Sequence, residues 1–133
     1  MFHQNQNMNK ELTKAEEQVM EHLWELEEAF VKEIVERMEE PRPAYTTIST
    51  IIRILEKKEI VAHKTYGNTH KYFPLISKAE YSEYCTRNLI RRHFEGSLGN
   101  LVSFFTSKNN LSLGELEEIQ QLINDEINQK KQS

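Results

Sequence analysis

Residues 45–75 read YTTISTIIRILEKKEIVAHKTYGNTHKYFPL, and this stretch decides the fold. It begins with a segment, opened by Pro43-Ala44-Tyr45-Thr46, whose apolar residues follow the i, i+3, i+4, i+7 spacing of one helix face. These residues are Ile48, Ile51, Ile52 and Leu55. The β-branched content also suits a strand, but the spacing favours a helix. Two candidate strands follow, Ile60–Tyr66 and His70–Leu75, with the hairpin signal Gly67-Asn68 between them.

Two further helices are predicted on the N-terminal side of this stretch. Thr13-Lys14-Ala15-Glu16 is a capping box, in which each side chain can bond the other residue's backbone N–H, and it predicts a helix from about Lys14 to Leu26. A second helix of about two turns carries Val31, Ile34, Val35 and Met38. It ends before Pro41-Arg42-Pro43, because the residue before a proline disfavours helical geometry. The connection between them lies around residues 27–30. Residues 1–11, rich in Asn and Gln, are expected to be a disordered lead.

Three helices are predicted after the hairpin. Capping boxes at Ser77–Glu80 and Ser112–Glu115 open the first and the last of them, and Gly96 and Gly99 mark a break before the middle one. The expected fold is mostly α with a small β-hairpin. Residues 12–75 form a winged helix-turn-helix DNA-binding domain, and residues 76–133 form a three-helix C-terminal dimerisation region.

The charge of the chain is unevenly distributed along its 133 residues. The net charge is −4, which at first suggests an acidic protein without affinity for nucleic acid. Residues 1–40 carry −7, residues 41–93 carry +6 and residues 94–133 carry −3. The positive charge therefore gathers on the predicted helix and hairpin of residues 45–75 and just beyond them.

This basic segment predicts a DNA-binding surface, because cations and hydrogen-bond donors recognise phosphates. Short hydroxyl side chains on the helix allow close approach to base edges, threonine methyls can contact thymine methyls, and arginine can pair with guanine. The alternative is a solvated helix face followed by an ordinary polar turn. The candidate DNA-binding residues are Tyr45, Thr46, Thr47, Ser49, Thr50, Arg53, Lys64, Tyr66, Asn68, His70 and Lys71.

Catalysis has no support in the sequence. The acidic run of residues 16–36 is read as a solvated helix face, the histidines lack metal-type spacing, and Cys85 is the sole cysteine. Phosphate loops and nucleophile motifs are absent. We expect neither enzyme activity nor a metal or other cofactor. Without a membrane-length apolar run or a secretory signal, the chain is expected in the cytoplasm, with no direct membrane insertion.

The last 57 residues carry apolar stripes that three short helices cannot bury by themselves. Two copies that intertwine would bury them, and a homodimer would also match a two-fold symmetric operator. Packing back on the first domain of the same chain is the alternative. The candidate dimerisation residues are Tyr81, Cys85, Leu89, Leu98, Leu101, Val102, Phe105, Leu116, Ile119 and Ile123.

Several segments together resemble the penicillinase repressor family of winged-helix transcriptional repressors. The resemblance covers about Leu12 to Asp125. It is carried by LTKAE at 12–16, VM and LW at 19–24, KEIV at 32–35, TTI at 46–48, IIRILEKKEI at 51–60, LVSFF at 101–105 and LGELEEI at 113–119. It implies a homodimeric repressor on a two-fold symmetric operator, including operators of β-lactam-resistance genes.

The resemblance also implies a mode of release. In one branch of the family a membrane sensor protease signals, and the repressor is cut in its dimerisation region before a Phe. By position that bond is Phe104–Phe105 here, although the family more usually has Asn before the cut. The copper-responsive branch uses C-terminal CxC motifs, which this chain lacks. A winged-helix adaptor that binds protein rather than DNA is the alternative function.

Overall fold

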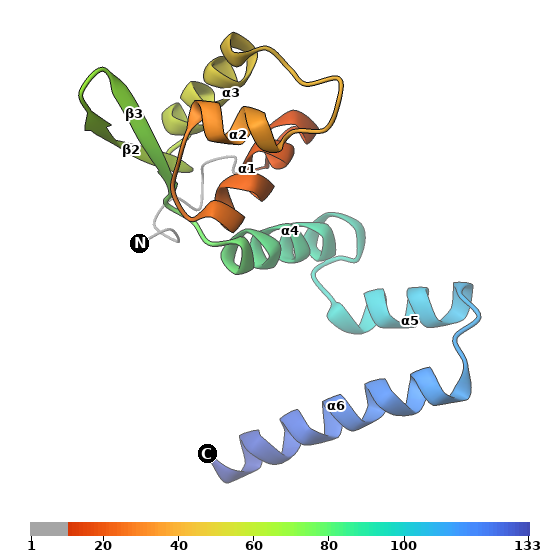
Figure 1. Ribbon diagram of the computed structural model, residues 1–133. Coiled ribbons are helices and arrows are strands. Elements are labelled where there is room, and N and C mark those ends of the chain that lie inside the picture. The colour runs from red at the N-terminus through yellow and green to blue at the C-terminus, as the bar shows by residue number, and fades with distance from the viewer. Residues whose placement is uncertain (1–10) are drawn as a thin grey trace. The chain divides into compact units, whose positions relative to one another are not determined.

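The computed structural model describes residues 11–133, in which six helices and three strands divide into two compact units (Figure 1). The first unit ends at Arg87, and the second runs from Asn88 to Ser133. The elements are α1 (Lys14–Leu26), β1 (Ala29–Phe30), α2 (Val31–Arg37), α3 (Tyr45–Lys57), β2 (Val61–Tyr66), β3 (Thr69–Pro74), α4 (Lys78–His93), α5 (Leu98–Lys108) and α6 (Leu113–Gln132). The predicted fold class, a helical chain with a winged helix, is confirmed. The expected disordered lead lies outside the described residues, apart from Glu11.

The three predicted capping boxes form and open α1, α4 and α6. Thr13 N–H donates to Glu16 at 2.9 Å, and Glu16 N–H donates back to the Thr13 hydroxyl at 3.1 Å. Ser77 and Glu80 exchange the same pair of bonds before α4. Ser112 and Glu115 do so before α6. Each box satisfies backbone donors that a helix start would otherwise leave unpaired, which is why the starts were predictable.

The small sheet has three strands rather than the two that the sequence predicts. Its order is β1-β3-β2, with all neighbours antiparallel. The additional strand β1 lies in the segment expected to be a plain connection, where Ala29 pairs with Tyr72 and Phe30 pairs with Lys71. Two residues are too short for an alternating pattern, and their partners lie far along the chain. The hairpin turn itself is at Gly67-Asn68, where Gly67 has a φ of 60° that suits glycine.

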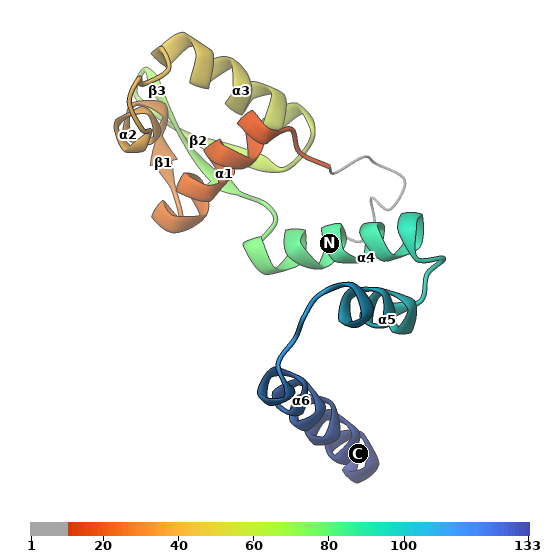
Figure 2. The same ribbon diagram turned by 90° about the vertical axis from the view of Figure 1, so that its right-hand side faces the viewer.

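The core of the first unit lies between α1, α2, α3 and the base of the hairpin. Both views place α1 between α3 and the start of α4 (Figures 1 and 2). The largest fully buried side chains of this core are Val19, Met20, Leu23, Ile34, Ile48, Ile52, Leu55, Ile60, Val61 and Ile76. Burial of each aliphatic side chain stabilises the fold by roughly 1.5–3 kcal/mol before conformational entropy is subtracted.

The start of α4 belongs to this core. Tyr81 is buried, and its hydroxyl accepts from Leu12 N–H at 3.1 Å and donates to Glu17 at 3.2 Å. The Tyr81 ring lies 5.9 Å from that of Trp24, whose indole N–H donates to the Ile76 carbonyl at 2.9 Å. The compact unit therefore extends to Arg87, beyond the boundary at residue 75 that the sequence led us to expect.

The second unit is formed by the end of α4 with α5 and α6, and none of its side chains from Asn88 to Ser133 is fully buried. The ring centroids of Phe94 and Phe104 lie 5.5 Å apart. The Ser97 side chain caps α5 by accepting from Asn100 N–H. Exposed apolar residues instead line α5 and α6. Within residues 11–133, no helix combines the length and the apolar character that crossing a membrane requires.

Candidate nucleic-acid interface

One face of α3 is exposed and carries the predicted recognition residues. Tyr45, Thr46, Thr47, Thr50 and Arg53 are exposed, and Ser49 is half-buried. The opposite face packs into the core through Ile48, Ile52 and Leu55. The structure therefore brings together the six candidates that the sequence placed on this helix.

The exposed face of α3 offers mostly hydrogen-bond donors. Ala44 is the N-cap residue and has no side-chain acceptor, so the first N–H groups of α3 stay available to an anion. The Thr50 hydroxyl donates to the Thr46 carbonyl at 2.9 Å, which leaves its oxygen free to accept and its methyl free to pack. In residues 11–133 the Arg53 guanidinium has no hydrogen bond or ion pair, so its donors are free for an external acceptor.

The register of the hairpin separates the predicted wing residues onto two faces. Thr65 pairs with His70 and His63 pairs with Tyr72, and these four side chains share the face that contacts α3. Lys64 pairs with Lys71 and Tyr66 pairs with Thr69 on the opposite face. The sequence predicts these wing residues as one group. The structure leaves His70 on the α3 side and places Lys64, Tyr66 and Lys71 on the other, with Asn68 at the turn.

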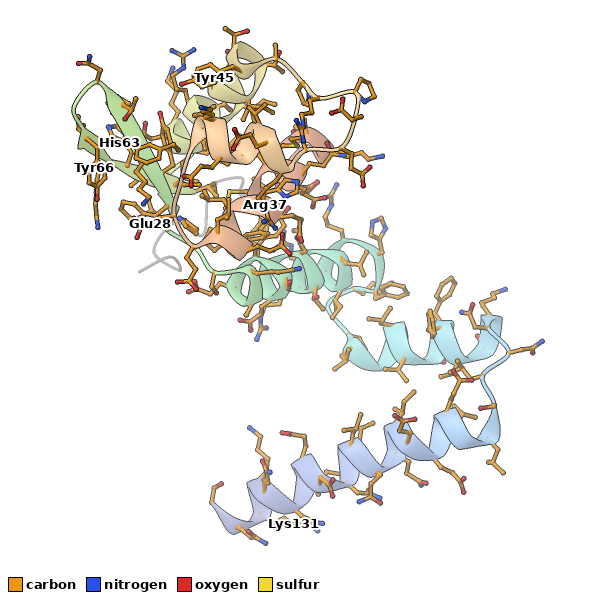
Figure 3. All side chains as sticks on the ribbon, viewed as in Figure 1. Glu28, Arg37, Tyr45, His63, Tyr66 and Lys131 are labelled. Carbon is orange, nitrogen blue, oxygen red and sulfur yellow. The ribbon has the colours of Figure 1, made fainter. Side chains whose placement is uncertain are left out.

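The face of the hairpin opposite to α3, called here the outer face, carries cation–aromatic contacts. Lys71 Nζ lies 5.3 Å from the centroid of the Phe30 ring and 6.0 Å from that of Tyr66, and it is 3.5 Å from Glu28. Figure 3 labels two of these partners, Glu28 and Tyr66. Phe30 and Tyr66 meet edge to face at 5.9 Å. The ammonium group of Lys71 is thus held close to the sheet. Lys64, whose Nζ lies 5.7 Å from the centroid of the Phe73 ring, and Tyr66, which is 49% exposed, are both exposed on this face.

Two residues that the sequence did not single out join α3 to the hairpin. Glu56 Oε2 lies 2.5 Å from Nδ1 of His63, whose ring stacks on that of His70 at 4.0 Å. Beside them, burial raises the pKa of the Tyr72 hydroxyl and the Glu56 carboxylate raises it further, while the Arg53 guanidinium lowers it. Glu56 and His63 are seven residues apart across a helix-to-strand corner, so no periodic pattern connects them.

The candidate dimerisation residues fall in both units. Tyr81 is buried inside the first unit and Cys85 packs partly buried against the same core, so their contacts are within the chain. The other eight lie in the second unit, where Leu101 is half-buried. Seven of them are exposed, namely Leu89, Leu98, Val102, Phe105, Leu116, Ile119 and Ile123. Phe104 and Phe105, the candidate cleavage residues, are both about half exposed within α5.

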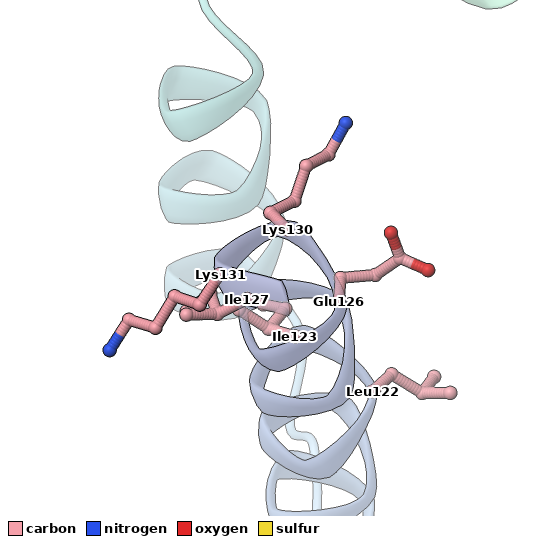
Figure 4. A pocket seen from close by; sticks show the side chains of 6 residues that line it. All are labelled: Leu122, Ile123, Glu126, Ile127, Lys130 and Lys131. Atoms are coloured by element: carbon pink, nitrogen blue, oxygen red, sulfur yellow. The ribbon is translucent and has the colours of Figure 1, made fainter. Parts of the chain in front are cut away.

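Two hollows on the surface of the described residues have different linings. The groove between α1 and α4 has a volume of 360 Å³, and its polar groups pair with each other, Tyr81 with Glu17 and Lys78 with Glu21 at 3.0 Å. A second, shallow hollow lies on α6 alone. It is lined by Leu122, Ile123, Glu126, Ile127, Lys130 and Lys131 (Figure 4). The described part of the chain holds no cluster of three or more His, Cys, Asp or Glu suited to a metal ion.

Comparison with known proteins gives a consistent family. The model of the family described as penicillinase repressor matches residues 12–125. The methicillin resistance regulatory protein MecI of Mammaliicoccus sciuri is 29% identical over 119 residues, which cover 89% of this chain and 97% of that protein. MecI of Staphylococcus aureus strain N315 is 28% identical with the same coverage. The penicillinase repressor of Bacillus licheniformis is 26% identical over 123 residues, 92% of this chain and 96% of its own. With its exposed recognition helix and hairpin, the chain therefore belongs to the penicillinase repressor family of DNA-binding transcriptional repressors.

Proposed function

We propose that the chain represses transcription as a homodimer, with α3 of each copy in the major groove of one half of a two-fold symmetric operator. The carrying observation is the exposed face of α3, where Arg53 has no hydrogen bond or ion pair among the described residues and the helix start has no side-chain cap. Unpaired donors on one helix face favour an external acceptor. Base edges and phosphates of DNA supply such acceptors. The hairpin lies beside the adjacent backbone in this arrangement.

Within the interface the candidate residues have different roles. Thr46, Ser49 and Arg53 reach base edges, since they lie on successive turns of the exposed face of α3. Tyr45 and Thr47, at the start of α3, contact phosphate together with the uncapped N–H groups. Lys64 and Tyr66 reach the backbone from the outer face of the hairpin, and Asn68 reaches it from the tip.

The second unit holds the dimer together in this proposal. Leu116, Ile119 and Ile123 recur along one face of α6 and are 40%, 39% and 50% exposed. Apolar side chains at that spacing, left open along a 20-residue helix, favour a partner helix. A second copy is the economical partner, because a two-fold operator needs two recognition helices.

The target genes are inferred from the names of the relatives, and the release step is inferred from the resemblance to the family. Two of them carry names that refer to methicillin resistance and one is called a penicillinase repressor. We therefore propose that the operator controls a β-lactam-resistance-type gene and that the protein acts in the cytoplasm. A cut between Phe104 and Phe105, by a membrane sensor protease or a protease downstream of it, would divide α5 and remove α6 from the DNA-binding unit.

The test is duplex binding measured at several salt concentrations. A duplex from the promoter upstream of the chain's own gene is titrated beside a random duplex of equal length. If the protein makes about six phosphate contacts, a plot of the logarithm of the binding constant against the logarithm of salt concentration should have a slope of about −5. Equal affinity for the two duplexes would contradict sequence-specific repression. A protein partner captured without any DNA shift would favour the adaptor function instead.

A further inference from the structure

A carboxylate lies on the recognition helix where DNA phosphates would disfavour it. Glu56 follows Arg53 by three residues, so the two side chains are neighbours on α3. A negative charge beside a base-reading arginine repels the phosphate backbone and weakens binding, unless it serves another purpose. The position of Glu56 therefore calls for a structural explanation.

The structure provides one in the contact between Glu56 and the wing. Glu56 Oε2 lies 2.5 Å from His63 Nδ1, and the two side chains keep 31% and 29% of their surface exposed. The His63 ring stacks on His70 at 4.0 Å with an interplanar angle of 28°, and it meets the edge of Tyr72 at 5.4 Å. Through His63, which Figure 3 labels on the hairpin, the carboxylate is thus connected to both strands.

The contact lies where the hairpin leaves the core. Val61 and Tyr72 are 1% and 4% exposed and anchor the base, whereas the residues from Lys64 to His70 are exposed. In residues 11–133, the Glu56–His63 contact is the hydrogen bond that joins α3 to this hairpin. The free half of the wing is a two-stranded ribbon, which twists and bends readily. On its outer face the wing is restrained by the pairing of Phe30 with Lys71 and by the Lys71–Glu28 ion pair, and on the α3 side it is restrained by the Glu56–His63 contact.

We propose that Glu56 and His63 form a clasp that sets the angle of the wing to the recognition helix, so that wing and helix contact DNA at the same time. The clasp rests on the proposed docking of α3 and the hairpin on DNA. Glu56 and His63 are positioning residues in this account, and they act through the phosphate contacts of the wing beyond them. Removal of the clasp lets the wing move away from the backbone, and the phosphate contacts it makes are lost.

The sign of the effect at Glu56 separates the clasp from simple electrostatics. Loss of a negative charge near DNA should by itself tighten binding. If the carboxylate holds the wing, the variant Glu56→Ala should instead bind more weakly. Glu56→Gln keeps a hydrogen-bond acceptor for an N–H of His63 while losing the charge, so it should bind at least as tightly as wild type. Glu36→Ala removes one exposed charge from α2 and is the matched control.

The experiment uses the full chain and the promoter duplex, with affinity measured over a range of salt concentrations. We expect Glu56→Ala and His63→Ala each to weaken binding about tenfold and to reduce the magnitude of the log–log salt slope by about 1 to 2, since each lost phosphate contact removes about 0.9. The double variant should bind DNA about as tightly as the single variant with the lower affinity, because the two residues act as one unit. The slope is unaffected by partial unfolding as long as the folded fraction does not change with salt, so the folded fraction of each variant is measured at every salt concentration.

Three outcomes decide the matter. Weaker binding and a shallower slope for Glu56→Ala, with rescue by Glu56→Gln, support the clasp. If Glu56→Ala binds as tightly as wild type or more tightly with an unchanged slope, the clasp is overturned while the DNA-binding function stands. If the wild-type chain itself shows no preference for the promoter duplex, the proposed docking fails and the clasp's role in DNA binding fails with it.

Discussion

The ammonium nitrogen of Lys58 lies 2.9 Å and 3.1 Å from the two carboxylate oxygens of Glu16. Glu16 is buried near the start of α1, and Lys58 is the C-cap residue of α3, so the pair ties the first helix to the recognition helix. Burial raises the pKa of the Glu16 carboxyl, but the hydrogen bonds from Lys58 and Thr13 and the Lys58 charge outweigh it, and the net pKa lies below its usual range.

Loss of the lysine should destabilise the first unit. In Lys58→Ala the Glu16 carboxylate stays buried without its counter-ion, and we expect the free energy of unfolding to fall by about 2 kcal/mol. This is less than the cost at a fully buried pair, since Lys58 is 31% exposed. Lys57→Ala removes an exposed neighbour on α3 and is the control. Denaturant titration compares them, and equal midpoints for the two variants would show that the ion pair adds nothing.

The pH dependence of stability should report the same pair. Because the folded-state pKa of Glu16 is lowered, its contribution is fully present above the unfolded value near 4.5 and is lost as pH falls through the folded value. Glu16→Gln should therefore be less stable than wild type at neutral pH, and the difference should shrink as the pH falls below the unfolded value and through the lowered folded value. Unfolding midpoints at a series of pH values measure this. A difference that stays constant with pH would mean that the carboxylate charge is not what stabilises the fold.

Local signals in the sequence predicted helix starts in both units. The capping boxes at Thr13, Ser77 and Ser112 placed three helix starts, because their hydrogen bonds span only three residues. The strand at Ala29–Phe30 was not predictable in this way, since it pairs with β3, about 40 residues further along the chain. Contacts between distant segments leave no periodic trace in one sequence.

The candidate site was predicted by composition and resolved only by geometry. The hydroxyl-rich face of α3 could be identified from the sequence, because helical periodicity separates Thr46 and Arg53 from the buried Ile48. The division of the wing was also implicit in the two-residue turn, since strand side chains alternate between faces. The contact between Glu56 and His63 was not, because it depends on the angle between a helix and a strand.

Arg53 should be the largest single contributor on the recognition helix. Its guanidinium has no partner among residues 11–133, so its truncation disturbs little within the fold. We expect Arg53→Ala to weaken binding to the promoter duplex by about 1–3 kcal/mol and to relax preference at one base pair of each half-site. Lys14→Ala in α1 is the charge-matched control and should leave preference unchanged. A uniform loss across all base substitutions would assign Arg53 to a phosphate rather than to a base.

The boundary of the first unit can be tested with two fragments. A fragment ending at Leu75 lacks Tyr81, which is 6% exposed and bonds Leu12 and Glu17, whereas a fragment ending at Arg87 retains it. We expect the longer fragment to be more stable by about 2–4 kcal/mol, because a large buried side chain and its hydrogen bonds are kept. Thermal unfolding of the two fragments measures the difference. Similar midpoints would place the boundary at residue 75 after all.

The apolar face of α6 should decide the oligomeric state. Ile123 is 50% exposed in the single chain, so a charge at this position costs nothing in a monomer. In a dimer held by this face, Ile123→Glu buries an unpaired carboxylate and should weaken association by about 3 kcal/mol, roughly 100-fold. Gln121→Glu places the same charge away from the stripe and is the control. Sedimentation should give twice the 15.8 kDa chain mass for wild type and control, and the single-chain mass for Ile123→Glu at equal concentration. If Ile123→Glu remains dimeric, the dimer interface does not include this face of α6. If the wild type sediments as a monomer, the chain does not dimerise and the stripe packs against its own chain.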